Sequence, residues 1–334
     1  MNAHALHTRE ETQPGWVAPV ETQLDLVERK LESVSTSDIQ TAFDLSIYMF
    51  SAGGKRVRPA LVLLSALASN AEADECRVVN LAAATELVHT ASLIHDDVVD
   101  ETSERRGVKT ANFMWGNKMS VLGGDFLLSK AFSLLAADSD SKIMRVLSSM
   151  AIGMGESEML QAESEGDIDA WQRNYWRIIR GKTASFLSAC CECGAMVAGA
   201  DASTRDSLVE YGLQIGTAFQ ITDDVLDIVG DPLETGKDIG SDLTHGKFTL
   251  PVLLAIQDAR VGKDILSLLR RGELTPDQAC EVANVVADCG AVEKARESAR
   301  NCAHKACEQL ATIPTSAYTQ ALESLAEFVI NRVA

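Results

Sequence analysis

The chain reads IHDDVVD at residues 94–100 and ITDDVLD at residues 221–227. In each stretch, two adjacent aspartates and a third one interrupt an otherwise aliphatic segment. Residues i and i+4 of an α-helix are neighbours on one face, so the first and last aspartate of each stretch share a face. Because apolar sequence surrounds both stretches, we interpret them as parts of two packed helices whose carboxylate ends alone are open.

The rest of the chain is rich in helix-forming residues. Hydrophobic residues make up 46% of its 334 positions, with 22 glycines and 7 prolines, which favours an all-α protein. Helical spacing of apolar residues predicts helices over 21–50, 59–69, 77–100, 117–136, 141–163, 169–199, 204–229, 250–271, 275–288, 291–311 and 315–332. We therefore expect a mobile N-terminal arm at residues 1–20 and a single domain at residues 21–334.

Charge and cysteine content exclude several classes of function. With 30 basic and 48 acidic residues the formal net charge is −18, whereas nucleic-acid binding needs a basic surface. No apolar run reaches the roughly 18–20 residues of a membrane span, and we predict a cytoplasmic protein. Cys190 and Cys193 form a single CxxC in a small, apolar stretch, so buried thiols are favoured over a zinc or redox site.

The aspartates have the chemistry of a magnesium site. Neighbouring like charges on a helix repel one another, and a divalent cation would remove that cost. Oxygen ligands completed by water and substrate phosphates suit Mg²⁺. The alternative, two solvated acidic helix faces, does not explain two matching copies among aliphatic residues. The predicted ligands are Asp96, Asp97, Asp100, Asp223, Asp224 and Asp227.

Cations lie close to both stretches in an otherwise acidic chain. The segments that contain them are GGKRVRP (53–59), ERRG (104–107), GKT (181–183) and GKDIGSDLTHGKF (236–248). Arginine binds phosphate through two donors and lysine acts as a point charge. Any one of these lysines could be an ordinary surface charge, but the pattern as a whole indicates diphosphate recognition.

In order and spacing, these segments resemble the trans-polyprenyl diphosphate synthases over roughly residues 20–330. Bacterial long-chain synthases of the octaprenyl and solanesyl type are the nearest likeness. The resemblance implies an isoprenoid-synthase-type helical bundle around a deep central cavity, usually a homodimer. It also implies a magnesium-dependent prenyltransferase that joins an allylic diphosphate to successive isopentenyl diphosphates, making quinone side chains, with about three Mg²⁺ ions in each active site.

The resemblance also assigns roles to individual residues. The six aspartates, with Lys182 and Lys247, would form the catalytic centre. The allylic diphosphate would be held by Arg105, Lys182, Thr183, Gln220, Lys237 and Lys247. Isopentenyl diphosphate would be held by Lys55, Arg58, His89 and Arg106. His89 lies two turns before Asp96 on the same face, although a lone histidine on an apolar helix is often a core residue. Many relatives carry Asn where Asp238 stands, and the role of Asp238 stays open.

Product length depends on the residues one turn and more before Asp96. In short-chain relatives a bulky aromatic near this position closes the pocket, whereas here Ala91 and Ser92 are small, with Val88 a turn below. We therefore predict a long product of about seven to ten isoprene units, with eight or nine preferred. Alternatively, the small residues only allow tight helix packing, and the product is a farnesyl or geranylgeranyl diphosphate.

Three other functions compete with this prediction. A terpene cyclase would share the fold and the first aspartate stretch, but it would not need the GGKRVR segment or the second DDxxD. A non-catalytic subunit of a heteromeric synthase would tend to lose its aspartates. A structural cation-binding protein would leave the lysines and arginines unexplained.

Overall fold

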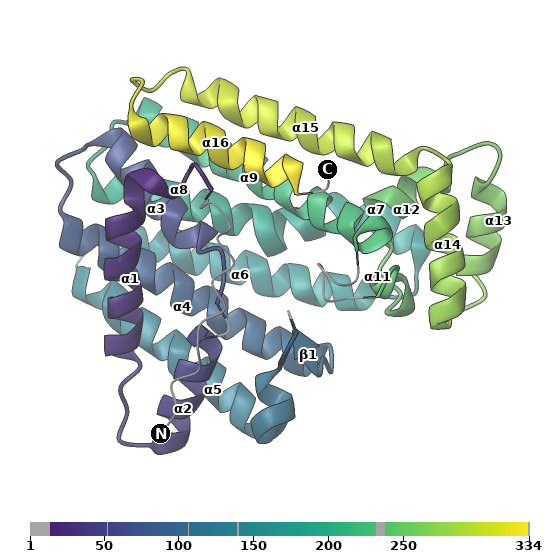
Figure 1. Ribbon diagram of the computed structural model, residues 1–334, viewed down its shortest axis with the longest axis horizontal. Helices are drawn as coiled ribbons and strands as arrows, with labels where there is room; N and C mark the ends of the chain where they lie inside the picture. Colours follow the sequence, from purple (N-terminus) through teal and green to yellow (C-terminus); the bar gives the residue numbers. More distant parts are fainter. Residues whose placement is uncertain (1–13, 52, 106, 139, 232–237, 333–334) are drawn as a thin grey trace.

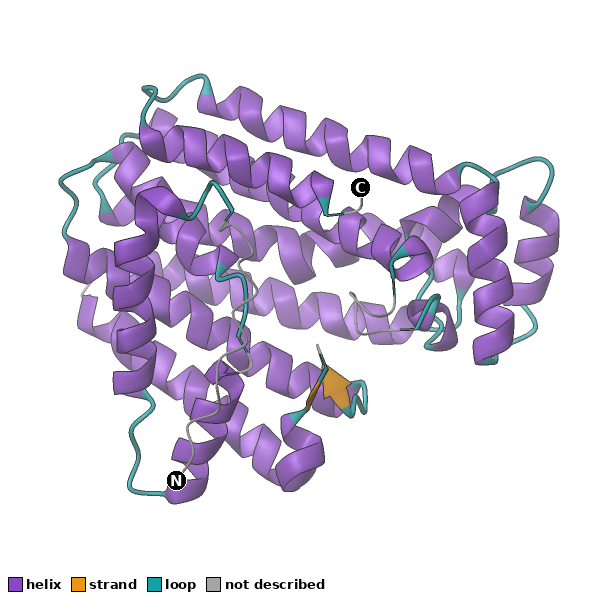
Figure 2. Cartoon of the chain, viewed as in Figure 1, coloured by secondary structure: helices purple, strands orange, loops and turns teal. Residues whose placement is uncertain are grey.

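The computed structural model describes residues 14–51, 53–105, 107–138, 140–231 and 238–332 (Figure 1). Within these residues the chain is helical apart from loops and one short antiparallel strand pair, β1 (Glu104–Arg105) and β2 (Val108–Lys109) (Figure 2). The prediction of an all-α fold is confirmed. The strand pair was not predicted, because two residues on each side of a turn are too few to show a period-two pattern.

The first half of the chain supplies η1 (Ala18–Val20), α1 (Glu21–Val34), α2 (Gln40–Ser51), α3 (Val57–Ser69), α4 (Glu75–Val99), α5 (Ala111–Asp138) and α6 (Ser141–Ser164). The second half supplies α7 (Ile168–Ile179), the π-turn η2 (Arg180–Ala184), α8 (Ser185–Val197), α9 (Ala202–Val229), α11 (Ser241–Thr244), α12 (Leu250–Ala255), α13 (Gly262–Leu269), α14 (Pro276–Asp288), α15 (Ala291–Leu310) and α16 (Ala317–Asn331).

Long helices form the body of the molecule. In Figure 1, α15 and α16 lie across the top, α9 runs beneath them, α4 and α6 cross the middle, and α2 and α5 lie at the lower edge. Helices α3 and α8 pack against each other and bury most of their residues. Buried apolar side chains form one cluster that extends from Trp16 to Val329. The two aspartate stretches end helices α4 and α9, which belong to this core.

Two predicted helices are interrupted. Ser35 and Thr36 turn their hydroxyls back onto the carbonyls of Leu31 and Ser33, and such local bonds compete with the helix ladder. The predicted helix 21–50 therefore splits into α1 and α2. The predicted helix 250–271 splits into α12 and α13, with a turn around Asp258.

The N-terminal arm needs a correction. The indole of Trp16 is only 1% exposed and lies 5.9 Å from the ring of Phe328 on α16, measured between centroids. Val20 is also buried. Residues 14–20 are thus packed against the domain, because a large apolar ring gains by leaving water. Residues 1–13 of the predicted arm lie outside the described residues.

Helix α5 is unusually apolar. Among the described residues it alone is long and apolar enough to cross a membrane by length and composition, a test that core helices of globular proteins also pass. Gly116 breaks its first turns with φ +78° and ψ 158°. Large apolar side chains on its surface, among them Leu122 and Phe132, are exposed. The predicted absence of a membrane span stays a prediction.

Candidate active site

The first aspartate stretch forms the last turn of α4. Asp74 caps the start of this helix, and its carboxylate accepts the backbone N–H of Arg77; Asp100 caps the end, and its N–H donates to the carbonyl of Asp96. Burial raises the pKa of Asp96 to about 6, against the opposing effect of Lys182. Burial also acts to raise the pKa of Asp100, but the nearby cations, Lys247 foremost and then Lys182, together outweigh it and the pKa is lowered. One helix turn thus holds two carboxylates with different proton affinities.

Asp97 points into the protein instead of toward this open turn. Its side chain is 1% exposed, and its Oδ1 accepts the Arg105 Nε and Nη2, both at 2.8 Å. Burial raises the pKa of the Asp97 carboxyl although Arg105 opposes the shift. Asn112 adds a second tie by donating to the carbonyls of Asp97 and Thr102. The strand pair that carries Arg105 is therefore fixed to the end of α4.

The second stretch forms the last turns of α9, and its middle aspartate is again turned inward. Asp224 is 2% exposed; its Oδ2 accepts the hydroxyl of Tyr175 at 2.6 Å, and its Oδ1 accepts the Gln220 amide at 3.1 Å. Burial raises the pKa of Asp224 to about 7. Asp223 pairs with Arg332 at 3.0 Å, at the end of α16. Asp227 accepts the N–H of Asp242 at 3.1 Å.

Lys247 connects the two stretches. Its Nζ lies 3.1 Å from Oδ1 of Asp100. Its backbone N–H donates to the carbonyl of Asp242, and the backbone N–H of Asp242 donates to the Asp227 carboxylate. A lysine that comes after the second stretch is thereby paired with the first. Lys247 thus links the last aspartate of the first stretch to the segment that binds the last aspartate of the second. That all six carboxylates share one metal site stays a prediction.

Lys182 and Thr183 lie in η2, a short π-helix, and single π-helical turns within α-helices are frequent at functional sites. Gly181 allows this turn to approach α6, since a Cβ at residue 181 would lie 1.8 Å from Oγ of Ser157. The Nζ of Lys182 pairs with Glu158 at 2.7 Å. Thr183 donates to Oε1 of Gln220 at 2.8 Å. The GKT segment is thus bonded to α6 on one side and to α9, next to Asp224, on the other.

Three of the residues predicted to hold isopentenyl diphosphate contact the rings of two phenylalanines. Arg58 lies 4.9 Å from the ring centre of Phe186, and the His89 ring packs edge-on to the same phenyl at 6.3 Å. Lys55 lies 4.6 Å from the ring centre of Phe328. These contacts hold cations over aromatic faces and bring Arg58 and His89 together from α3 and α4.

The carboxylates suit Mg²⁺ in their chemistry, although within the described part of the chain no three potential ligands are close enough to hold an ion by themselves. Mg²⁺ is commonly bound by one or two carboxylates with water and substrate phosphates. The raised pKa of Asp96 is the supporting observation, because a divalent cation would offset the cost of a poorly hydrated carboxylate. The metal role of the six aspartates stays a prediction.

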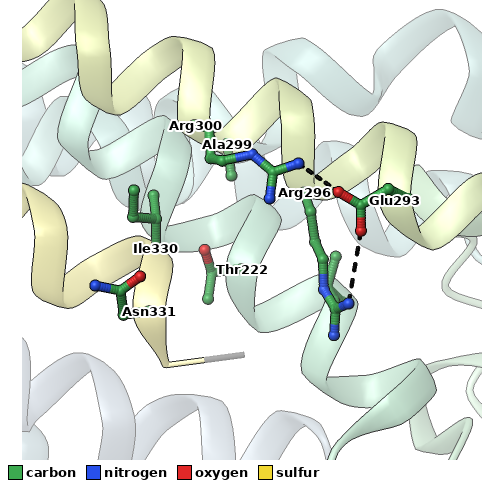
Figure 3. Close-up of a pocket in the computed structure, with 8 residues that line it drawn as sticks. Thr222, Glu293, Arg296, Ala299, Arg300, Ile330 and Asn331 are labelled. Atoms are coloured by element: carbon green, nitrogen blue, oxygen red, sulfur yellow. Dashed lines mark hydrogen bonds and ion pairs between the residues drawn. The ribbon is translucent and has the colours of Figure 1, made fainter. Parts of the chain in front are cut away.

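Two predicted residues, Arg106 and Lys237, lie outside the described residues. Asp238 is exposed. A cavity of about 140 Å³ between α9, α15 and α16 contains none of the predicted residues (Figure 3). On its wall, Glu293 pairs with Arg296 and Arg300.

Several neighbours of the site had little signal in the sequence. Glu158 and Tyr175 bind Lys182 and Asp224 from α6 and α7, and Phe186 and Arg332 complete other contacts. Phe186 is the one with a signal, because it follows the GKT segment by one turn. The others lie at ordinary helix positions where nothing in the local pattern separates them from core or surface residues.

Comparison with known proteins supports this interpretation of the motifs. The family model described as polyprenyl synthetase matches residues 40–287. The chain belongs to this family. This polyprenyl synthetase is 37% identical to the octaprenyl diphosphate synthase of Escherichia coli, over 89% of its own length and 91% of the relative's. It is 35% identical to a short chain isoprenyl diphosphate synthase of Methanothermobacter thermautotrophicus, over 91% and 94%.

A solved structure agrees with this assignment. A polyprenyl synthase of Caulobacter crescentus, complexed with calcium and isoprenyl diphosphate, matches with a TM-score of 0.91 at 35% identity, covering 98% of this chain and 100% of the other. The fold is therefore the all-α isoprenoid-synthase fold, and the protein is an enzyme that transfers prenyl groups. Relatives of different product length match similarly well, so the comparisons do not select a product.

Proposed function

We propose that this polyprenyl synthetase is a magnesium-dependent enzyme that extends an allylic diphosphate with isopentenyl diphosphate to a long all-trans polyprenyl diphosphate. The observation that best supports this proposal is the ion pair between Lys247 and Asp100, because it links the segment after the second aspartate stretch to the end of the first. We infer from it that the carboxylates that would hold metal ions and the cations that would hold diphosphates belong to one site.

The chemistry requires stabilisation of a leaving diphosphate instead of a nucleophilic side chain. Mg²⁺ held by the open aspartates would neutralise charge on that group when bound. Lys182, Lys247 and Arg105 supply fixed positive charge from three separate elements, and charge that is already in place stabilises the transition state strongly in many such reactions. Arg58, Lys55 and His89 would hold isopentenyl diphosphate so that its double bond attacks the allylic carbon, with the lost proton passing to the departing diphosphate.

Turnover by the purified chain alone tests the activity. With Mg²⁺, labelled isopentenyl diphosphate and an allylic primer, we expect linear polyprenyl diphosphate as product, and Lys247→Ala to lower turnover by at least about a hundredfold. A cyclic hydrocarbon would indicate a terpene cyclase. Absence of turnover until a second protein is added would indicate a subunit of a heteromeric synthase.

The proposed product has eight or nine isoprene units and serves quinone side chains. Ala91 and Val88 are buried on α4 below Asp96, and Ser92 is partly buried with its hydroxyl bonded to the carbonyl of His89. None of the three offers a large ring to stop a growing chain. A shorter product of the farnesyl or geranylgeranyl class is the alternative.

Enlarging these side chains tests the length. Ala91→Phe should shorten the product, because a phenyl one turn below the metal site would block the path of the chain. Ala82→Phe is the matched control, since nine residues along a helix is two and a half turns and places it on the opposite face. Unchanged length in Ala91→Phe, with the protein folded, would contradict the proposal.

We further propose a cytoplasmic homodimer. Exposed apolar side chains gather on two helices that contact each other, α5 and α6; they include Leu122, Phe132, Ile152 and Met159. Exposed apolar patches commonly mark protein interfaces, and we infer that these side chains belong to one. A second copy would cover them.

A further inference from the structure

The arginine at the centre of the GGKRVRP segment is buried in a network of its own. The side chain of Arg56 is 14% exposed, and its Nη1 donates to Glu86 Oε1 at 2.8 Å. Its Nε and Nη2 bind the two carboxylate oxygens of Glu28, and Nη2 also reaches the carbonyl of Phe50 at 3.4 Å. One guanidinium therefore ties together α1, the end of α2, and α4.

The backbone at Arg56 is as unusual as its side chain. It has φ +48° and ψ 36°, in the left-handed region that non-glycine residues seldom adopt. Arg56 is also the residue at which α3 starts, because its carbonyl accepts the N–H of Ala60. Such a conformation persists only where the surroundings hold it. Here the two carboxylates, one of them 7% exposed, supply that restraint.

This turn sets the direction of two site residues. Lys55 precedes Arg56 and lies over Phe328, and Arg58 follows it in the first turn of α3 and lies over Phe186. Glu86 adds a third link, because it precedes His89 by one turn on the same helix. The Arg56–Glu86 pair thus fixes the separation between the GGKR turn and His89, across which a diphosphate would bind.

We propose that Arg56 is a positioning residue for isopentenyl diphosphate: it does not hold the diphosphate but fixes the turn that aims Lys55 and Arg58. The proposal rests on the proposed function, which assigns these two residues and His89 to that substrate. The hydrogen bonds that the Arg56 guanidinium makes in the structure are donated to the carboxylates of Glu28 and Glu86 and to the carbonyl of Phe50.

Steady-state kinetics of Arg56 variants test this role. In Arg56→Gly, which keeps the backbone unstrained but removes the clamp, the KM for isopentenyl diphosphate should rise by at least about tenfold while the KM for the allylic primer and kcat change less than about threefold. Arg56→Ala should show the same split with a larger loss of thermal stability. Arg56→Lys keeps the charge but cannot bond to both carboxylates as the planar guanidinium does, so its KM for isopentenyl diphosphate should lie between those of the wild type and Arg56→Gly.

A matched control removes a comparable ion pair elsewhere. Arg77 forks onto Asp138 with two bonds of 2.9 Å, joining α4 to the end of α5. Arg77→Ala should lower the melting temperature and leave both KM values unchanged. If Arg56→Ala behaves in the same way, Arg56 is only structural and the proposal is overturned.

Glu86→Gln separates positioning from direct binding. If Arg56 held the diphosphate, loss of the competing carboxylate would release the guanidinium, and the KM for isopentenyl diphosphate would fall. A positioning role predicts that this KM rises. Failure of the proposed function would be distinct, since the wild-type enzyme would then not incorporate isopentenyl diphosphate at all.

Discussion

Asp97 and Asp224 occupy the same place in the two aspartate stretches, and both bind protein donors instead of facing their open helix ends. Asp97 holds Arg105, and Asp224 holds Tyr175 and Gln220. The sequence pattern treats the three aspartates of each stretch alike. Their environments differ in burial, and the middle aspartate of each stretch is the most deeply buried.

Tyr175→Phe tests the inward contact. A buried carboxylate would lose a charge-assisted bond, so the free energy of unfolding should fall by about 1–3 kcal/mol. Turnover should also fall, because Asp224 lies between Asp223 and Asp227 in the last turns of α9. Tyr211→Phe is the control: its hydroxyl is equally buried and donates to the carbonyl of Leu322 at 2.7 Å. Urea denaturation would measure the free energy of unfolding of both variants, and steady-state kinetics would measure their turnover. Equal turnover in the two variants would contradict the expectation.

Asp96 gives a pH-dependent prediction for the metal-free enzyme. Its folded pKa, about 6, is above the ordinary value of 3.8. Between these pH values the folded state holds a proton that the unfolded state has lost, so stability falls as pH rises through this window. Asp96→Asn removes this dependence and should be more stable than wild type at pH about 7.5 by a margin that shrinks toward pH about 5.

Asp100→Asn should change the stability of the folded enzyme in the opposite direction. Burial acts to raise the pKa of Asp100, but Lys247 holds it below the ordinary value, so the ionised group contributes stability that is lost only as pH falls through the folded pKa. Asp100→Asn should therefore destabilise the enzyme at neutral pH. Denaturation midpoints across pH, in a chelator, would show the two variants changing in opposite directions; a common direction would refute both assignments.

At the scale of single elements, apolar spacing predicted α3, α4, α6, α9 and the C-terminal helices well. Boundaries failed where local bonds decide, as at Ser35, or where two segments separated by a turn share one apolar pattern, as around Asp258. The site residues were predictable where a local sequence pattern marks them, as in the two aspartate stretches. The clamp on Arg56 was not, because Glu28 and Glu86 are far apart in sequence and look like ordinary helix charges.

Gly181→Ala tests the close approach of η2 to α6. The added Cβ would meet Oγ of Ser157 at 1.8 Å and the carbonyl of Gly153 at 2.9 Å. We expect a loss of about 1–3 kcal/mol in stability and a higher KM for the allylic primer, because Lys182 moves with the turn. Adding Ser157→Gly should restore part of both.

Gly155→Ala is the control for that experiment. Its Cβ would meet nothing within 4 Å, and alanine favours a helix more than glycine does. It should leave kinetics unchanged and stability equal or higher. Thermal melts and kinetics of the three variants test the set, and a harmless Gly181→Ala would refute the close-packing explanation.

At the scale of the whole molecule, the exposed apolar residues of α5 and α6 predict an assembly. Phe132→Glu with Met159→Glu should shift the protein from dimer to monomer in analytical ultracentrifugation, since charges would be buried at the interface. Trp176→Glu, which changes an apolar residue on α7 of intermediate exposure between Phe132 and Met159, should leave the dimer intact. A wild-type monomer at micromolar concentration would contradict the assignment of this face.

The contact between Trp16 and Phe328 joins opposite ends of the chain. Phe328 also lies under Lys55, so the ring that supports this lysine belongs to α16, far along the chain from the lysine itself. Since domains fold as they are synthesised, most of the bundle can form before α16 emerges, but the aromatic floor under Lys55 cannot. A nascent chain without α16 would therefore lack this part of the substrate site, and it could bind isopentenyl diphosphate fully only after α16 has been made.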